Sequence, residues 1–478
     1  MAERPNVLWI YCDELRADGL QCYGNDSPPV QTPNLDRLAA DGARFQSCFC
    51  NSPICVSSRT SALTGLDPED TGVYCNEGFW PTYRMDRPVK TFPEVFADRG
   101  YTTANFGKVH VPRELQAWQH SDGTGAGMQE LARACPGGTW TSLGEPDCCG
   151  VMPAGKPYPP ERLTENALAF LAKAEGPFLL RASYLQPHTP VLPPAAYGDM
   201  YMDCPWDGSP PQREGLSFHE RQWLRTWDER GYSHETMRAM RMRYYALCTW
   251  VDAQVGVLLA ALEERGLAED TIVLFTADHG CMAGDWGLSG KQLFHHWTHR
   301  VPLIVRWAGG VPAGDVREDI CEGLDLARTL FGLAGIEPTA ERFKGRDLFS
   351  EPAPDAVFST IGYGFPGSRC APYGQSGTYP GGRGWPRRAC VRTTRYRFDK
   401  TVRIDGRPAR REEEDAFLVD VETDPDETRN LAGDPALRAV VEDLSARIDA
   451  HVADSYEPPH RYCDPVAAGI VKRATPLH

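Results

Sequence analysis

A single cysteine stands four residues before an arginine in a run of small hydroxyl residues, as Cys55 and Arg59 in SPICVSSRTSALTG. If TSALTG continues a helix that begins near the thiol, Cys55 lies in its first turn and Arg59 one turn later on the same face. Unpaired N–H groups and the helix dipole favour negative charge there. A nucleophile, a fixed cation and a helix N-terminus together indicate a site for attack on a tetrahedral oxyanion. The alternative is a buried structural cysteine beside a solvated arginine.

Two pairs of polar residues follow strongly apolar runs elsewhere in the chain. NVLWIYCDEL ends its apolar run at Asp13 and Glu14, and TIVLFTADHG ends at Asp278 and His279. Carboxylate and imidazole groups at two strand ends suit a divalent cation such as calcium, magnesium or manganese. Either pair alone is also compatible with a turn or a helix cap. The glycine after Asp278 and His279 favours the ligand interpretation, because it lets the backbone turn away.

The elements that must position these side chains alternate between buried strand patterns and helical patterns. A strand over residues 6–13 precedes a helical pattern in 32–45, and the alternation recurs in 92–108, 165–187 and 243–280. Strands separated by helices imply crossover connections, so the predicted fold is α/β, with a mostly parallel central sheet sandwiched by helices. Ligands bind beyond the carboxyl ends of the strands in such sheets, which is where both polar pairs lie.

The chain has 478 residues, which predicts one large domain with a smaller appendage. We expect a catalytic domain over residues 1–355 and a C-terminal α+β domain over 356–478. In the latter, ACVRTTRYRFDK and EDAFLVDVET indicate antiparallel strands, and residues 434–455 indicate a helix.

Two long segments, residues 112–160 and 362–388, have the composition of irregular loops. Loops of this length usually serve a site or are disordered. The second is either a substrate-facing loop or a domain linker. As a loop it offers four plausible substrate contacts, Arg369, Tyr373, Arg383 and Trp385.

The composition excludes some partners and favours one compartment. The chain has a net charge of -15 and no block of basic residues, which argues against a surface that binds nucleic acid or an anionic membrane. An anionic substrate therefore needs a local cationic pocket. No apolar stretch reaches the roughly 20 residues that span a bilayer, and the first strand leaves no room for a signal peptide. This predicts a cytoplasmic protein in which the 16 cysteines are thiols rather than disulfides.

The stretch around Cys55 resembles the signature of the formylglycine-dependent sulfatases, Cys-x-Pro-Ser-Arg followed by Thr-Gly, although Ser57 stands where proline is usual. Further segments resemble the family in its own order: NVLWIYCDELRADGLQCYGN, QTPNLDRLAADGARF, FGKVH, QPHTP, FTADHG, GKQLFHHWTHRVPLIVRWAG and DVETDPDETRNLAGDP. Together they run from residue 6 to about residue 435. The resemblance implies membership of the alkaline-phosphatase-like superfamily, which also includes phosphonate monoester hydrolases and phosphodiesterases.

The resemblance also implies a modified residue and a metal. Cys55 would be oxidised to formylglycine by a separate formylglycine-generating enzyme, and the hydrated aldehyde would be the nucleophile. Asp13, Asp278, His279 and the diol of residue 55 would bind one divalent cation, with Glu14 as a further ligand. Glu14 replaces the commoner aspartate, and His279 stands where many members have asparagine. Ca²⁺ is the expected ion, with Mn²⁺ or Mg²⁺ as alternatives.

The remaining catalytic roles follow from the same resemblance. The groups expected to bind and stabilise the transferred sulfate are Arg59, Lys108, His188 and Lys291. His188 and Lys291 would protonate the leaving alcohol. His110 would take a proton from the second hydroxyl of the diol, so that sulfate leaves the covalent sulfo-enzyme and the aldehyde is restored. A cluster of three histidines is interpreted as structural or supporting, with substrate contact as the alternative: His295, His296 and His299.

Three functions are compatible with these residues. The leading hypothesis is a sulfuric ester hydrolase, arylsulfatase-like, acting on a small or sugar-like sulfate monoester. The alternative is a phosphonate monoester hydrolase or phosphodiesterase on the same scaffold, because an Asp-His pair occurs in both groups. A third is a non-catalytic metal- or anion-binding protein in which Cys55 stays unmodified. The oligomeric state is open, although homo-oligomers are common among large α/β hydrolases.

Overall fold

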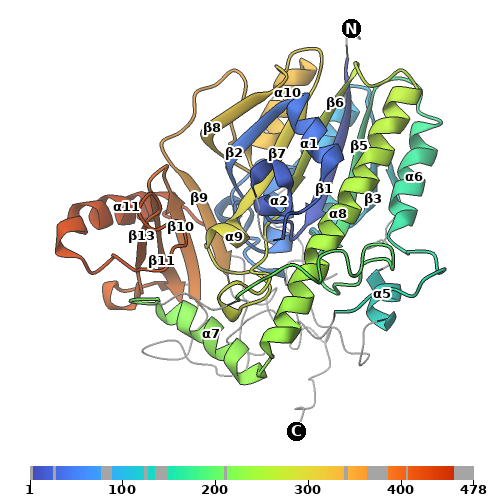
Figure 1. Ribbon diagram of the computed structural model, residues 1–478. Helices are drawn as coiled ribbons and strands as arrows, with labels where there is room; N and C mark the ends of the chain where they lie inside the picture. Colours follow the sequence, from blue (N-terminus) through green and yellow to red (C-terminus); the bar gives the residue numbers. More distant parts are fainter. Residues whose placement is uncertain are drawn as a thin grey trace, which may run out of the picture.

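The structure is a computed structural model that describes residues 4–24, 28–76, 89–122, 128–134, 149–208, 213–337, 343–362, 386–404 and 407–456. Two sheets organise these residues (Figure 1). An eight-stranded sheet with its helices forms the main body. A five-stranded sheet near the C-terminus, with helix α11, forms a smaller unit that we call the second sheet unit.

The central sheet has the strand order β4-β3-β5-β1-β6-β7-β2-β8. Its strands are β1 Asn6–Asp13, β2 Ala43–Phe49, β3 Thr102–Gly107, β4 His120–Ser121, β5 Phe178–Pro187, β6 Thr271–Ala277, β7 Arg300–Arg306 and β8 Asp315–Glu322. Only β7 runs antiparallel to its neighbours, β6 and β2. The predicted mostly parallel sheet is therefore confirmed.

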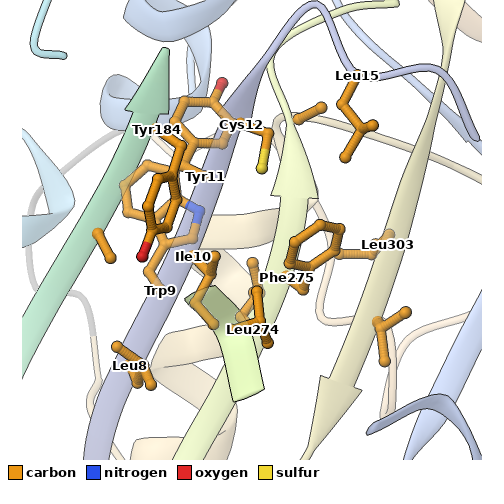
Figure 2. Close-up of a cluster of buried hydrophobic side chains, with 14 of the residues drawn as sticks. Leu8, Trp9, Ile10, Tyr11, Cys12, Leu15, Tyr184, Leu274, Phe275 and Leu303 are labelled. Atoms are coloured by element: carbon orange, nitrogen blue, oxygen red, sulfur yellow. The ribbon is translucent and has the colours of Figure 1, made fainter. Parts of the chain in front are cut away.

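The two faces of the central strands are both buried. Every residue of β1, β5 and β6 is buried, which explains why these segments are almost continuously apolar in the sequence. Figure 2 shows part of this core, with side chains of β1 beside those of β6. Because side chains alternate along a strand, Trp9 and Tyr11 share one face, and Trp9 packs on Phe92 of α4 with ring centroids 5.3 Å apart. Helices therefore cover the central strands closely and hold the strand ends in place.

The helices lie in groups around this sheet. Their bounds are α1 Pro33–Ala40, α2 Cys55–Thr64, α3 Pro68–Thr71, α4 Phe92–Asp98, α5 Met128–Ala134, α6 Glu161–Leu171, α7 Phe218–Arg230, α8 His234–Glu264, α9 His296–His299, α10 Asp325–Ala334 and α11 Arg438–His451. Helix α8 packs against α1, α6 and β5, whereas α2 packs against α4 and α10 (Figure 1).

Helix α8 alone among the described residues is long and apolar enough to cross a membrane by length and composition. Its most apolar window is 67% buried inside the protein. Trp250 of α8, for example, packs edge-on against Tyr184 of β5 at 5.9 Å between ring centroids. The hydropathy of α8 is thus accounted for by the core that it helps to form.

The second sheet unit is antiparallel, as predicted for an α+β region. Its strands are β9 Val357–Gly362, β10 Pro386–Arg392, β11 Tyr396–Ile404, β12 Arg407–Pro408 and β13 Phe417–Asp420. Leu444 and Ile448 of α11 pack on its apolar face with Val391 and Phe398. The expected domain boundary at residue 355 lies just before β9 and stays a prediction.

Residues 112–160 are more regular than their composition indicates. The described part contains a short 3-10 helix, Arg113–Leu115, the strand β4 and the helix α5. The expectation of an irregular loop missed helix α5, because MQELARA forms only two turns and has Gly and Pro residues on either side. All cysteines in the described ranges are free thiols, in agreement with the predicted absence of disulfides there.

Candidate active site

The predicted site residues gather at one edge of the central sheet. Strands β3, β5, β1 and β6 are neighbours, and each is followed by candidate residues at its carboxyl end. Lys108 and His110 follow β3, His188 follows β5, Asp13 ends β1, and Asp278 follows β6. Residues far apart in the sequence thus meet because parallel strands share this edge.

Helix α2 begins at Cys55, as the sequence predicts. The first intrahelical bond runs from Ser58 N to Ile54 O at 3.0 Å, and the helix ends at Gly65, whose φ of 62° is left-handed. All ten helix residues are buried. The alternative of a solvated Arg59 is wrong, since this side chain is 0% exposed.

Four predicted metal ligands converge to within 4.8 Å of one another: Asp13, Cys55, Asp278 and His279. His279 Nε2 lies 3.3 Å from Cys55 Sγ and 3.5 Å from Asp278 Oδ1. His279 Nδ1 lies 2.9 Å from the carbonyl of Gly280 and donates to it, so Nε2 is the nitrogen that faces the group. Two buried carboxylates and an imidazole fit a divalent cation.

Arg59 holds the two carboxylates of this group. Its Nε donates to Asp278 Oδ2 at 2.7 Å, and a terminal nitrogen donates to Asp13 Oδ2 at 3.2 Å. The other terminal nitrogen donates to Ser183 Oγ at 3.0 Å, and the guanidinium lies 4.8 Å from the centre of the Tyr11 ring. Burial alone would lower the pKa of Arg59, but the charges of Asp278 and Asp13 raise it, so the cation is fixed.

Glu14 lies beside the four-residue group and contacts two of the predicted substrate-binding residues. Its Oε1 is 2.7 Å from Lys291 Nζ, and its Oε2 is 4.0 Å from His188 Nε2. The backbone of Glu14 has a φ of 60°, and its carbonyl accepts a hydrogen bond from Tyr244 Oη at 2.6 Å. This turn aims the Glu14 carboxylate at Lys291 and His188.

Two buried lysines bring positive charge next to the Cys55 thiol, and each also pairs with a carboxylate. Lys291 Nζ lies 2.9 Å from Cys55 Sγ, and Lys108 Nζ bonds to Asp13 Oδ2. Burial would raise the pKa of the Cys55 thiol, but the charges of Lys108, Lys291 and His279 hold it well below its usual range. Lys108 and Lys291 are therefore the ammonium groups that an anionic substrate could contact here.

The two predicted proton-transfer histidines lie close to these groups. Burial and the neighbouring Lys108 charge lower the pKa of His110 to about 4, although its contact with Cys55 acts in the opposite direction. Its imidazole is thus neutral near pH 7. His188 Nδ1 lies 2.5 Å from the carbonyl of Thr189, which leaves Nε2 directed at Glu14.

The histidine cluster after Lys291 contacts the second sheet unit and the turn that follows β13. His295 Nε2 lies 2.9 Å from the carbonyl of Asp426, and His299 Nε2 lies 2.5 Å from Ser359 Oγ. His296 Nδ1 is 3.7 Å from Glu427 Oε1. These contacts agree with a structural role. The four suggested substrate contacts at 369, 373, 383 and 385 lie outside the described residues.

Two residues that order this site are not among the predicted site residues. Ser183 accepts a hydrogen bond from Arg59, and Tyr244 fixes the turn at Glu14. Both lie in largely apolar stretches, in β5 and α8, where an isolated polar residue is easily taken for an ordinary residue of the core. A polar group near the carboxyl end of a buried strand is the signal that points to Ser183.

Comparison with known families agrees with this geometry. A model of the family described as Sulfatase matches residues 5–336, which is more than half of the chain. The chain belongs to the sulfatase family. A second family model, described as N-sulphoglucosamine sulphohydrolase, C-terminal, matches residues 284–454 of this chain.

Several known proteins are similar over nearly the whole length. The ulvan-active sulfatase of Formosa agariphila is 28% identical over 475 residues, covering 94% of this chain and 81% of that protein. The structure of BT4656 in complex with its substrate D-glucosamine-2-N,6-O-disulfate has a TM-score of 0.73 at 20% identity, with 94% and 98% of the chains covered. The phosphonate monoester hydrolase of Agrobacterium radiobacter also has a TM-score of 0.73, at 23% identity and 97% coverage of both chains. These likenesses confirm the alkaline-phosphatase-like fold.

Proposed function

We propose that this sulfatase-family hydrolase cleaves the sulfate monoester of a small or sugar-like alcohol, at residue 55 after its conversion to formylglycine. The supporting observation is the convergence of Asp13, Cys55, Asp278 and His279 within 4.8 Å, next to two buried lysines. Carboxylates and imidazole can hold a cation, and the lysines can hold an anion. Such a pair of neighbouring subsites is what attack on a sulfate ester requires.

Asp13, Asp278 and His279 would hold one divalent cation, with Glu14 as a further ligand. Ca²⁺ is the expected ion, and Mn²⁺ or Mg²⁺ are alternatives. When present, the cation and the formylglycine hydrate supply positive charge beside the sulfate and a nucleophilic hydroxyl group. Arg59 contributes by fixing both carboxylates, so that the ligand atoms are already oriented before the ion binds.

The other side chains bind the sulfate and move protons. Lys108 and Lys291 present ammonium groups to the sulfate oxygens, where negative charge increases during the reaction. Lys291 Nζ, 2.7 Å from Glu14 Oε1, or His188 Nε2, 4.0 Å from Glu14 Oε2, supplies the single proton that the leaving alcohol takes up. His110, in contact with residue 55, accepts a proton from that residue, which allows sulfate to leave and the aldehyde to be restored.

Hydrolysis of phosphonate monoesters or phosphodiesters is the second candidate function. It is favoured by His279, since an imidazole suits Mn²⁺ better than Ca²⁺, and phosphonate and sulfate groups are similar tetrahedra. The test compares kcat/KM for 4-nitrophenyl sulfate, 4-nitrophenyl phenylphosphonate and bis(4-nitrophenyl) phosphate. We expect the sulfate monoester to be the best substrate by at least tenfold. A higher value for either phosphorus substrate contradicts the proposal and favours the second function.

Conversion of Cys55 is a separate proposal that mass spectrometry tests. We expect the peptide containing residue 55 to be lighter than its sequence mass by the difference between a thiol and an aldehyde, when a formylglycine-generating enzyme is co-expressed. The peptide containing Cys390 should keep its sequence mass in the same sample. An unmodified Cys55 in an active preparation contradicts the proposed nucleophile.

Lys291→Met is expected to lower kcat for an alkyl sulfate by about 10²-fold or more, because the leaving alcohol loses a proton donor. The loss should be smaller for 4-nitrophenyl sulfate, whose leaving group departs readily as an anion. The measurement is kcat for both substrates in the variant and the wild type. Lys173→Met removes an exposed lysine and should change neither rate. Equal losses on both substrates would assign Lys291 to sulfate binding alone.

A further inference from the structure

A second group of ligand-type side chains, two buried carboxylates and a partly buried histidine, lies away from the site described above. Asp67, Glu69 and His451 each offer one ligand atom, and these atoms lie within 4.8 Å of one another. Asp67 and Glu69 belong to the start of α3, shortly after the helix that carries Cys55. His451 is the last residue of α11. The group therefore joins the main body to the second sheet unit.

The polar atoms of this group lack ordinary partners. Glu69 is 3% exposed, and among the described residues neither of its carboxylate oxygens has a hydrogen bond. His451 Nε2 also has no hydrogen bond and lies 3.4 Å from Glu69 Oε2. The hydroxyl of Thr360 on β9, which is 0% exposed, contacts the Glu69 carboxylate. The Glu69–His451 pair is long, and a ligand between the two side chains would compensate both better.

The surrounding contacts hold these side chains in position. The His451 ring stacks on Phe358 with centroids 4.4 Å apart and an angle of 8° between the ring planes. The carbonyl of Glu69 accepts a hydrogen bond from Tyr456 N at 2.7 Å, and Tyr74 Oη donates to Tyr456 O at 2.8 Å. The segment after α11 is thereby fixed against α3, so the donors are already oriented toward one another.

The charge balance of the group leaves room for a cation. Lys344 Nζ lies 3.0 Å from Asp67 Oδ2 and 2.6 Å from Asp70 Oδ2, so its charge is shared between these two carboxylates. Asp67 retains its second oxygen, because a carboxylate has two. Glu69 is left with His451 and the more distant charge of Arg387. A divalent ion would compensate both carboxylates and bind the imidazole nitrogen that faces Glu69.

We propose that Asp67, Glu69 and His451 bind a second divalent cation, which joins the second sheet unit to the main body. Two carboxylates and one imidazole, with the Thr360 hydroxyl alongside, form an oxygen and nitrogen donor set that suits Zn²⁺. The ion is structural, because no substrate-binding residue contacts the group among the described residues. This proposal is independent of the reaction at residue 55.

Metal stoichiometry tests the proposal. The full-length protein is stripped with a chelator, exposed to excess Zn²⁺, desalted, and measured by elemental analysis and native mass spectrometry. We expect Glu69→Gln and His451→Gln each to hold one zinc fewer per chain than the wild type. Glu130→Gln and His120→Gln change exposed residues and serve as matched controls with unchanged zinc content. Equal zinc content in all five proteins overturns the proposal.

Two further measurements separate this site from the active site and from misfolding. In the Asp278→Asn background, Zn²⁺ should still raise the unfolding temperature, and it should fail to do so once Glu69→Gln is added. Anomalous diffraction at the zinc edge from crystals of the unaltered chain requires no variant. A peak between Glu69 and His451 supports the proposal, whereas its absence in zinc-soaked crystals shows an ion pair only and overturns it.

Discussion

Cys55→Ala is expected to lower kcat/KM for 4-nitrophenyl sulfate by about 10⁴-fold or more, because the proposed nucleophile grows from this side chain. The fold should persist, since alanine is smaller than cysteine and a good helix former at the start of α2. Substrate affinity should change far less than kcat, because Lys108 and Lys291 remain. The measurement is steady-state kinetics together with circular dichroism and the unfolding temperature.

Cys390→Ala is the matched control for this experiment. Cys390 is also fully buried, but it lies on β10 in the second sheet unit. Its loss should leave kcat unchanged within a factor of about two, so a general effect of removing a buried thiol would be visible. Retention of more than a few per cent of the activity in Cys55→Ala would refute the role proposed for residue 55.

Arg59→Met is expected to lower the free energy of unfolding of the metal-free protein by about 3–5 kcal/mol. The guanidinium is 0% exposed and donates to both Asp13 and Asp278, so its removal leaves the Asp278 carboxylate without its cation and Asp13 with Lys108 alone. A bound divalent cation would compensate part of that charge. Cation addition should therefore raise the unfolding temperature more in Arg59→Met than in the wild type.

Thermal unfolding with chelator and with excess Ca²⁺ or Mn²⁺ measures this difference. Arg37→Met, at a mostly exposed arginine that pairs with Glu263 across 3.7 Å, should unfold like the wild type in both conditions. Arg59→Lys keeps the positive charge but cannot donate hydrogen bonds to both carboxylates. Its rise in unfolding temperature on cation addition should lie between those of Arg59→Met and the wild type. An equal response to the cation in Arg59→Met and the wild type would contradict the metal site at Asp13 and Asp278.

The parts of the fold that follow from local pattern could be predicted from the sequence. The apolar runs of β1 and β6 end at Asp13 and Asp278 because the strands are buried on both faces and then reach the ligand-binding edge. Helix α2 was predictable from its small residues and terminal glycine. The family resemblance then supplied the partners at 108, 188 and 291, which no local pattern distinguishes.

Features that depend on contacts between distant segments could not be predicted. The Glu14 contact with Lys291 joins residues 277 positions apart. The complete burial of Arg59 depends on Ser183 and Tyr11, which belong to different strands. Helix α5 was missed because seven residues amid glycine and proline carry too little periodicity. The group at Asp67, Glu69 and His451 was missed because spacing gives no indication that α3 meets α11.

The complete burial of α2 limits when residue 55 can be modified. Cys55 is 1% exposed, and every residue of its helix is buried. A modifying enzyme therefore cannot bind this segment in the folded protein. The oxidation proposed for Cys55 would therefore take place during synthesis, before this part of the chain has folded. The fraction of molecules that carries the modified residue would then depend on how fast the chain folds relative to the oxidation. Treatment of the folded, purified protein would not change that fraction.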